Sequence, residues 1–497
     1  MNLESKTSFT ALLLILLTFC GSIFSASAET DGIPVTTKSF KAKELLLQGR
    51  NANELGDFLK AQKLCKQAIK EDPHFAHAYF MLAYSSNSTQ EFKENLEMAE
   101  QHAHHCSEAE QLLIKIGLSY FNATLAYRLD LAKQLVELLP KSPRAWIYRS
   151  FIQTENNDID KARQSLKKAI ALDEEFHYGY QQLGFSYLNL KPNDFGKAVQ
   201  NMREAVKLVP ESTQAYINLG DAWRGNAKLK MARQNYSKAI EKDPENALAY
   251  LKRAHSNVFL DDIEKARTDY QKAVELASEI TQSAYSNYKA FTHIHEGKPM
   301  EAFDELKVVL EKIDQLNLTQ GQKQGRNIFT LHNMIRICVH NKQYDQAEEC
   351  LVKYAKVVKE RMAAIQSERF ALNQEANIEL HRIYFLAHKG DFNQAHAKCT
   401  AVKKIYTELE NENLMENYYG ILAYVYFKEN KFDDAIASYQ KSDMNDIFNK
   451  YYLAMAYEQT GDKEKARELL KEVADFNFNN VEYALLRKQA LKKIKSL

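Results

Sequence analysis

The stretch that decides the fold runs from Tyr216 to Pro244 and reads YINLGDAWRGNAKLKMARQNYSKAIEKDP. Its apolar residues recur at helical spacing in two blocks, which predicts two amphipathic helices. Small residues stand where these helices would meet: Gly220 in the first block, and Ala232 and Ala239 in the second. Pro244 cannot continue a helix and ends the unit. The stretch therefore predicts one pair of closely packed antiparallel helices.

The same pattern recurs along the chain at nearly constant spacing. Ala198, Ala232 and Ala266 lie 34 residues apart, and Ala162 precedes Ala198 by 36. The preceding unit repeats the pattern with Tyr180, Leu183, Gly184, Tyr187, Ala198, Met202, Ala205 and Pro210. A 34-residue period with small residues at fixed places resembles the tetratricopeptide repeat. The resemblance implies an all-α fold, a right-handed superhelical solenoid of antiparallel helix pairs, whose function is to bind another protein.

Composition agrees with a helical protein and excludes some partners. The 497 residues include only 16 glycines and 8 prolines, and this scarcity favours long helices over sandwiches or barrels. The hydrophobic content of 45% is sufficient for a packed core. Lysine and arginine (66) balance aspartate and glutamate (65) to a formal charge of +1. No strong field attracts the chain to nucleic acid, so we predict a protein or peptide partner and no nucleic acid.

The first 28 residues are typical of an export signal. An apolar stretch from Ala11 to about Phe24 is followed by Ala26-Ser27-Ala28, with small residues at the positions that a signal peptidase reads. We expect cleavage after Ala28, followed by a linker over 29–41. Two alternatives are an uncleaved membrane anchor and a lipid anchor on Cys20. The apolar core is shorter than the ~20 residues of a spanning helix. We therefore expect an exported protein, periplasmic or secreted, with no integral membrane segment after cleavage.

The strength of the repeat pattern divides the rest of the chain. Residues 42–142 contain repeat-like helices that are partly degenerate, 143–280 form a regular array, and 281–480 form an irregular array with longer spacing. Residues 481–497 have apolar residues on one face and lysines on the other, as expected of a C-terminal capping helix. Gln320–Gly325 contains two glycines and predicts a loop that separates two superhelical halves.

The resemblance also implies which residues line a concave groove on the first helices of the repeats. The candidates are Tyr178, Gln181 and Phe185 in one unit, Gln214, Asp221 and Arg224 in the next, and His255 in the third. Aromatic residues beside isolated polar groups suit an extended peptide or a helix. The alternative is that these side chains pack between repeats and face no partner.

One local cluster suggests metal chemistry. His102-Ala103-His104-His105-Cys106 contains imidazole and thiol groups of the zinc-ligand type. Adjacent residues on a helix point in different directions, so we interpret the cluster as a polar helix end and predict neither a metal site nor a cofactor. The sequence has no phosphate loop, dinucleotide fingerprint or nucleophile elbow. We accordingly predict that the protein is not an enzyme and acts as an interaction scaffold or adaptor.

Two other functions remain as alternatives. A glycan-binding surface protein would need tryptophan-bearing loops, whereas the chain has only Trp146 and Trp223, both at repeat positions. An enzyme could place an unrecognised site in the irregular region between Ile280 and Glu412.

The cysteines do not form the pattern of a disulfide framework. Signal cleavage would leave an odd, sparse set of five: Cys65, Cys106, Cys338, Cys350 and Cys399. Such a set is typical of buried free thiols. The alternative is a single bond between Cys338 and Cys350, which fall on the two helices of one repeat.

Overall fold

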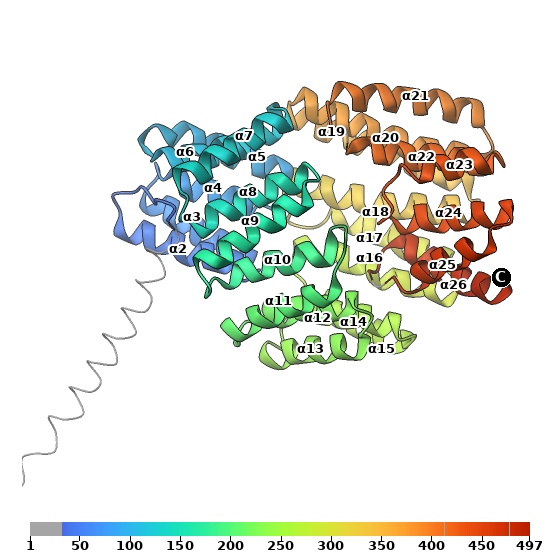
Figure 1. The fold of residues 1–497 in the computed structure, drawn as a ribbon, viewed down its shortest axis with the longest axis horizontal. Helices are drawn as coiled ribbons and strands as arrows, with labels where there is room; N and C mark the ends of the chain where they lie inside the picture. The colour runs from blue at the N-terminus through green and yellow to red at the C-terminus, as the bar shows by residue number, and fades with distance from the viewer. Residues whose placement is uncertain (1–31, 412, 477) are drawn as a thin grey trace, which may run out of the picture. The chain divides into compact units, whose positions relative to one another are not determined.

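The computed structural model describes residues 32–411, 413–476 and 478–497 (Figure 1). Within these ranges the regular elements are helices, with no strand, and most consecutive helices pack in pairs joined by short turns. This confirms the predicted all-α class and the stacking of helix pairs. The expected signal peptide, residues 1–28, lies outside the described residues. None of the helices described is both long and apolar enough to cross a membrane.

The chain divides into two compact units. Unit 1 comprises the residues up to Ser85, Asn95–Tyr120 and Leu125–Gln182, and unit 2 comprises Ser86–Glu94, Phe121–Thr124 and Leu183–Leu497. The main division therefore falls inside helix α10 (His177–Asn189). The predicted break at Gln320–Gly325 is wrong, because these residues form the first turns of helix α18 (Gln320–His340). Thr319 and Gln322 make a capping box there, and this reciprocal pair of hydrogen bonds starts a helix despite the two glycines.

The helices before the division are α2 (Phe40–Glu54), α3 (Phe58–Glu71), α4 (Ala76–Tyr84), α5 (Thr89–His102), α6 (Glu108–Asn122), α7 (Leu125–Leu138), α8 (Pro143–Glu155) and α9 (Ile159–Leu172). After α10 follow α11 (Phe195–Leu208), α12 (Thr213–Gly225), α13 (Leu229–Lys242), α14 (Ala247–Phe259), α15 (Ile263–Leu276), α16 (Glu279–Glu296), α17 (Pro299–Ile313) and α18. The last helices are α19 (Tyr344–Ile365), α20 (Glu368–Lys389), α21 (Phe392–Glu408), α22 (Leu414–Lys428), α23 (Phe432–Tyr439), α24 (Ile447–Thr460), α25 (Lys463–Ala474) and α26 (Val481–Ser496).

Unit 1 begins with an anchored segment where the sequence predicted a linker over 29–41. Helix α2 already starts at Phe40, capped by Ser39. Before it, Thr36 donates from its backbone N–H and from Oγ1 to the Glu110 carboxylate, at 2.9 and 2.5 Å. Burial works to raise the pKa of Glu110, but hydrogen bonds from His77 and Thr36 lower it to about 2. The ionised carboxylate of Glu110 therefore fixes the segment before α2 onto α4 and α6.

Small residues allow the two helices of a pair to approach closely. The marker alanines Ala162, Ala198, Ala232 and Ala266 are fully buried. In the pair α12–α13, a Cβ atom on Gly220 would lie 2.4 Å from the ring of Tyr236. That ring is itself fully buried. The recurrent glycine is therefore a contact residue, and this contact explains its place in the repeat.

The turns between paired helices share one backbone conformation. A residue with positive φ stands in these turns, as at Gly56, Asn157, Ala227, Asp261, Gly297, Lys342, Gly390, Asn430 and Gly461. The left-handed region favours glycine and asparagine. Where alanine or lysine occupies this position, the residue type does not predict the left-handed turn.

The five described cysteines are free thiols. Four of them are buried: Cys65, Cys338, Cys350 and Cys399. Burial raises the pKa of the Cys65 and Cys399 thiols to about 12, so both remain protonated and act as small apolar core residues.

Candidate functional site

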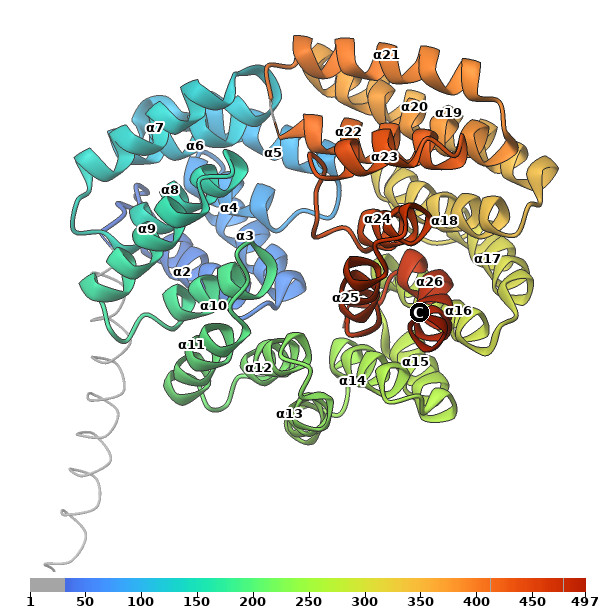
Figure 2. The ribbon, with the colours of Figure 1, turned by 45° about the vertical axis from the view of Figure 1, so that its right-hand side comes forward.

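The first helices of the pairs in unit 2 form a continuous row. Helices α12, α14, α16, α18, α20, α22 and α24 each contact the next first helix along the chain. The C-terminal helix α26 follows α25 and also packs against α16, α18 and α24 of this row (Figure 2). We call this surface the first-helix row, and it is the candidate site.

The residues predicted to line the groove lie on α10, α12 and α14. Gln181, Asp221, Arg224 and His255 are buried, whereas Tyr178, Phe185 and Gln214 are half-buried. The three residues on α10 lie beside the division between the two units, on a helix that precedes the row. Gln214 donates from Nε2 to Asn218 of its own helix at 2.8 Å. Asp221, Arg224 and His255 make side-chain contacts with other elements of unit 2.

Asp221 is the centre of a buried ionic cluster. Its carboxylate accepts hydrogen bonds from Arg224 Nη2 at 2.9 Å, Lys252 Nζ at 2.8 Å and Tyr236 Oη at 2.7 Å. Burial works to raise the pKa of Asp221, but Lys252 and Arg224 lower it to about 2. The carboxylate is ionised and paired, so it joins α12, α13 and α14.

The segment before α26 covers the neighbouring residues of the row. The Arg224 guanidinium lies 4.8 Å from the centre of the Phe478 ring. His255 Nδ1 lies 2.6 Å from the Tyr270 hydroxyl, which also accepts a hydrogen bond from Asn479 Nδ2 at 3.0 Å. Residues 478 and 479 therefore contact Arg224 directly and His255 through Tyr270.

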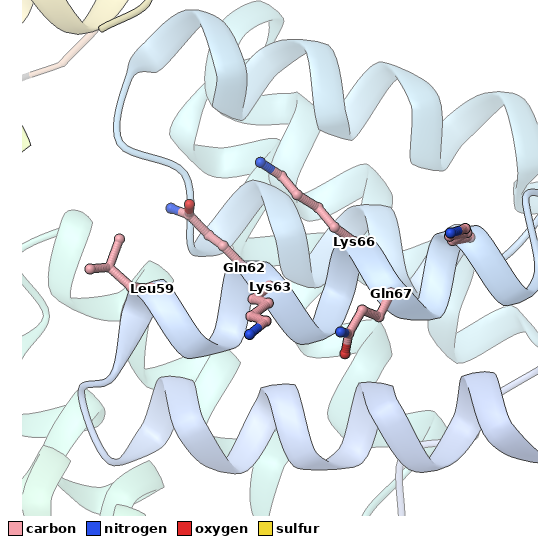
Figure 3. A pocket seen from close by; sticks show the side chains of 6 residues that line it. Leu59, Gln62, Lys63, Lys66 and Gln67 are labelled. Carbon is pink, nitrogen blue, oxygen red and sulfur yellow. The ribbon is translucent and has the colours of Figure 1, made fainter. Parts of the chain in front are cut away.

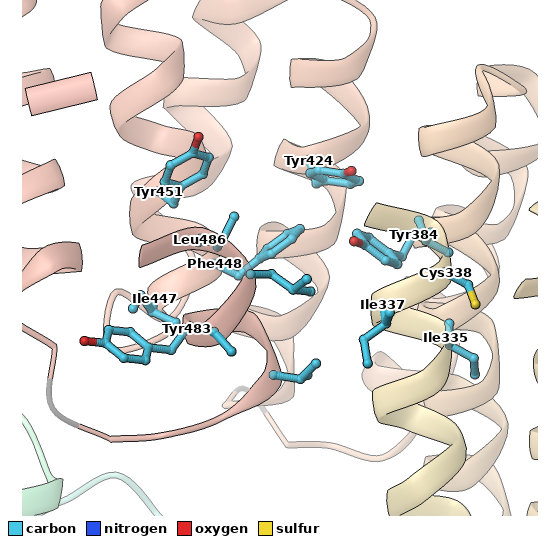
Figure 4. Packing of buried hydrophobic residues seen from close by; sticks show 14 of the residues in the cluster. Ile335, Ile337, Cys338, Tyr384, Tyr424, Ile447, Phe448, Tyr451, Tyr483 and Leu486 are labelled. Carbon is cyan, nitrogen blue, oxygen red and sulfur yellow. The ribbon is translucent and has the colours of Figure 1, made fainter. Parts of the chain in front are cut away.

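Helix α26 buries its apolar side against the row. Val481, Tyr483 and Leu486 are each at most 2% exposed. Figure 4 shows Leu486 beside Phe448 of α24 and Tyr483 next to Ile447 of the same helix, with Ile337 of α18 nearby. Burying side chains of this size stabilises by roughly 1.5–3 kcal/mol each. The expected helix at 481–497 is therefore an occupant of the first-helix row and does more than cover the last repeat.

An ion pair fixes the first turn of α26 to α18. The Glu482 carboxylate lies 2.8 Å from Arg336 Nε and 3.4 Å from His332 Nε2. The Arg336 guanidinium also lies 4.3 Å from the centre of the Tyr384 ring. Burial works to raise the pKa of Glu482, but Arg336 and His332 hold it well below its usual range. Glu482 is therefore ionised and paired at neutral pH.

Three further polar contacts hold α26 along its length. Arg487 donates to both oxygens of Asp261, at 2.5 and 3.2 Å, just beyond the end of α14. Gln489 Nε2 lies 2.8 Å from His340 Nε2 on α18. Lys493 Nζ lies 2.7 Å from the carboxylate of Glu458 on α24. The helix is thus bound in one register by side chains from several repeats.

His295 on α16 makes this docking sensitive to acid. The ring is 5% exposed, and its Nε2 lies 3.4 Å from Asn479 Oδ1. Burial lowers the pKa of His295 to about 4; Arg487 and Lys488 also lower it, and the Asn479 bond and Asp261 oppose them. An unfolded histidine has a pKa near 6.5. Stability from neutral His295 is therefore fully present above about pH 6.5 and is lost as pH falls through about 4.

We expect His295→Gln to remove part of the acid sensitivity of the fold. Glutamine is neutral at every pH and retains an N–H donor for Asn479. Between pH 7 and 4, the free energy of unfolding should fall in both proteins. The fall should be smaller in the variant, by up to about 3 kcal/mol. Thermal unfolding midpoints at pH 7.5 and 4.5 for both proteins measure this difference. An identical drop in the two proteins would contradict the assignment.

Beyond α26, an aromatic strip of the first-helix row remains half-exposed. It consists of Tyr285 and Tyr288 on α16 and Arg326 and Phe329 on α18. The Tyr288 and Phe329 ring centres lie 6.3 Å apart. Sequence reasoning missed this strip because the repeat register loosens after Ile280, although Tyr288 keeps the aromatic place of the repeat.

The strip lies outside the part of α18 that the C-terminal helix contacts through polar groups. The partners of α26 on α18 are His332, Arg336 and His340. All three follow Phe329 in the sequence. The aromatic strip therefore lies on the same row, toward the N-terminus of α18 from the residues that bind α26.

The predicted polar helix end at 102–106 does not gather metal ligands. His102 ends α5, and His104 and His105 follow in a short 3-10 turn. His102 Nδ1 lies 3.3 Å from Nδ1 of His74. Among the residues that the structure describes, no group of three or more His, Cys, Asp or Glu side chains is placed to hold a metal ion.

A surface depression on α3 offers no better site. Figure 3 shows its lining, which is Leu59, Gln62, Lys63, Lys66, Gln67 and Lys70. All six residues come from one helix, so no opposing wall can enclose a ligand.

The residues relevant to the two alternative functions have structural contacts. The Trp223 ring lies 4.9 Å beneath the Arg203 guanidinium, and Trp146 donates from Nε1 to the Pro140 carbonyl at 3.1 Å. In the irregular region, the ionisable groups of His332 and Arg336 converge, but they pair with Glu482 of α26.

Comparison with solved structures finds partial likenesses at low sequence identity. The Cut9–Hcn1 hetero-tetramer of the APC/C matches over 97% of this chain and 82% of that chain, at 16% identity and a TM-score of 0.43. A tetratricopeptide repeat protein from Parabacteroides merdae matches over 58% and 98%, at 13% identity and a TM-score of 0.34. The type IV pilus biogenesis factor PilW matches over 39% and 88%, at 14% identity and a TM-score of 0.32. Comparison with curated proteins finds no match.

Family models give the decisive comparison. Models described as tetratricopeptide repeat match residues 46–104, 143–176, 188–247, 247–280, 405–444 and 450–475. Together they cover about half of the chain, including both the regular array and parts of the degenerate and irregular regions. Stacked repeats of this kind present long surfaces for other proteins, which supports a role as a protein–protein interaction scaffold. The chain belongs to the tetratricopeptide repeat family.

Proposed function

We propose that this protein is an exported interaction scaffold that binds a peptide or helix of another protein along the first-helix row of unit 2. One observation carries the proposal: the row already holds an amphipathic helix, α26, through buried apolar residues and the Glu482–Arg336 ion pair. A surface that accommodates one helix in a fixed register has the shape and polarity to accommodate another.

The aromatic strip is the part of the row that we propose for the partner. Tyr285, Tyr288 and Phe329 combine large apolar area with few rotatable bonds, which favours such residues at protein interfaces. We propose no catalytic activity, because the buried carboxylates Asp221 and Glu482 are paired with arginine and lysine side chains of the row. The formal charge of +1 also favours a protein partner over nucleic acid.

Site-specific photo-crosslinking in the native host tests this function. A photoreactive phenylalanine analogue is placed at Phe329 in the strip and, as a matched control, at Val352 on α19, which is 66% exposed. We expect a discrete crosslinked partner from position 329 and none from 352. Equal capture at both positions, or capture at 352 alone, would contradict binding along the first-helix row.

Export rests on the N-terminal sequence and has its own test. We propose that residues 1–28 are removed and that the mature chain begins at Glu29. N-terminal sequencing of protein purified from the exported fraction should read Glu-Thr-Asp-Gly. Recovery of the intact N-terminus from the cell interior would refute this part of the proposal.

A further inference from the structure

Arg326, in the aromatic strip of unit 2, pairs with no carboxylate among the residues that the structure describes. Its side chain is half-buried, and its Nε is buried without a hydrogen-bond partner within the described chain. A buried donor without an acceptor costs about 1–3 kcal/mol. Burial also lowers the pKa of Arg326, with Tyr285 as the opposing influence. The guanidinium therefore has no anionic partner within the described chain.

The surroundings of Arg326 are aromatic. Tyr285 and Tyr288 are half-buried on the neighbouring helix α16, and burial raises the pKa of Tyr285 to about 12. Phe329 follows Arg326 by three residues on α18, so both side chains lie on the same face of that helix. Charge-assisted hydrogen bonds are strong in such partly desolvated surroundings.

Arg336, ten residues later on α18, shows how such a site is completed. Its guanidinium also lies beside aromatic rings, at 4.3 Å from Tyr384 and 4.8 Å from Phe448. Unlike Arg326, it receives a carboxylate, that of Glu482 at 2.8 Å. The rise of an α-helix places the two arginines about 15 Å apart along the axis. Helix α26 supplies a carboxylate to Arg336 but none to Arg326.

We propose that Arg326, together with Tyr285, Tyr288 and Phe329, binds a side-chain carboxylate in an acidic segment of a partner protein that also carries aromatic or leucine residues. This inference rests on the proposed function and specifies the chemistry of its partner. The guanidinium would form charge-assisted hydrogen bonds through its terminal Nη–H groups and so acquire the carboxylate that Arg336 receives from Glu482. Neighbouring rings would contact the apolar side chains that flank the carboxylate.

The test uses two synthetic peptides and the full chain. The first peptide has the sequence of residues 480–486, Asn-Val-Glu-Tyr-Ala-Leu-Leu, with blocked ends and a fluorescent label, so that the glutamate is its sole charged group. The second replaces that glutamate with glutamine. Fluorescence anisotropy gives the affinity of each peptide for the original chain, for Arg326→Gln and for Arg467→Gln, a half-exposed arginine of α25. Circular dichroism verifies that each variant keeps its helix content.

We expect the original chain and Arg467→Gln to bind the glutamate peptide about tenfold more tightly than the glutamine peptide, a difference of about 1.4 kcal/mol. Arg326→Gln should bind both peptides alike. Arg326→Lys, which keeps the charge but loses the planar fork, should show an intermediate preference.

A preference that persists in Arg326→Gln would overturn the inference, as would equal binding of both peptides to the original chain. Equal binding would leave the proposed function intact, because the row would still bind a peptide. If neither peptide binds the original chain, the Arg326 site is refuted, and crosslinking at position 329 then decides separately whether the row binds a partner.

Discussion

Replacing Arg336 with methionine is expected to lower the free energy of unfolding by about 3–5 kcal/mol, the usual cost of leaving a buried charge without its partner. The Glu482 carboxylate is only 13% exposed and lies 2.8 Å from Arg336 Nε. Methionine should retain contact with the rings of Tyr384 and Phe448. The loss in the free energy of unfolding should therefore come mainly from removing the Arg336 charge beside Glu482. Chemical denaturation and the thermal unfolding midpoint of Arg336→Met measure the effect.

A double variant separates the ion pair from simple packing. Arg336→Met combined with Glu482→Gln removes both charges, and it should recover most of the stability that the single variant loses. His332 then faces a neutral amide at 3.4 Å instead of a carboxylate. If the free energy of unfolding of Arg336→Met lies within about 1 kcal/mol of that of the original chain, the ion pair does not hold α26 to the first-helix row.

Replacing Gly220 with alanine is expected to destabilise the protein by about 1–3 kcal/mol, as overpacking of a dense core does. The added Cβ would lie 2.4 Å from the Tyr236 ring. That ring cannot move aside freely, because it is fully buried and its hydroxyl donates to Asp221 at 2.7 Å. The helices α12 and α13 would have to separate, and a lower thermal midpoint is the direct measure.

Gly325→Ala is the matched control for that substitution. Gly325 lies inside α18, and no heavy atom lies within 4 Å of a Cβ placed on it. Alanine should therefore stabilise the helix by roughly 0.5–1 kcal/mol. Equal effects of the two substitutions would show that the close approach at Gly220 does not constrain the pair.

The helix pairs could be predicted from the sequence because each pair is encoded locally. Ala162, Ala198, Ala232 and Ala266 sit at the contacts between paired helices, and all are buried as expected. The turns at Ala227 and Lys342 could not be predicted, because neither residue type favours the left-handed conformation that it adopts there.

The site could not be predicted, because its contacts join distant parts of the chain. Arg336 and Glu482 are 146 residues apart, and neither lies in a recognisable motif. The lysines of residues 481–497 suggested a solvated cap, whereas α26 buries Tyr483 and Leu486 in the first-helix row. Asp221, Arg224 and His255 occupy groove places by resemblance, but covering by Phe478 and Asn479 is a tertiary effect. Local periodicity therefore gives the repeats, and long-range pairing decides which surface stays open.

Hydrogen exchange of the amides in residues 481–496 of the full chain tests most directly whether the first-helix row holds a helix. Their backbone should exchange as slowly as α18, on which α26 packs, because both belong to one buried cluster. The same amides should exchange much faster in Arg336→Met. Exchange at the rate of a free peptide in the original chain would contradict the account, because the row would then have no demonstrated capacity to bind a helix.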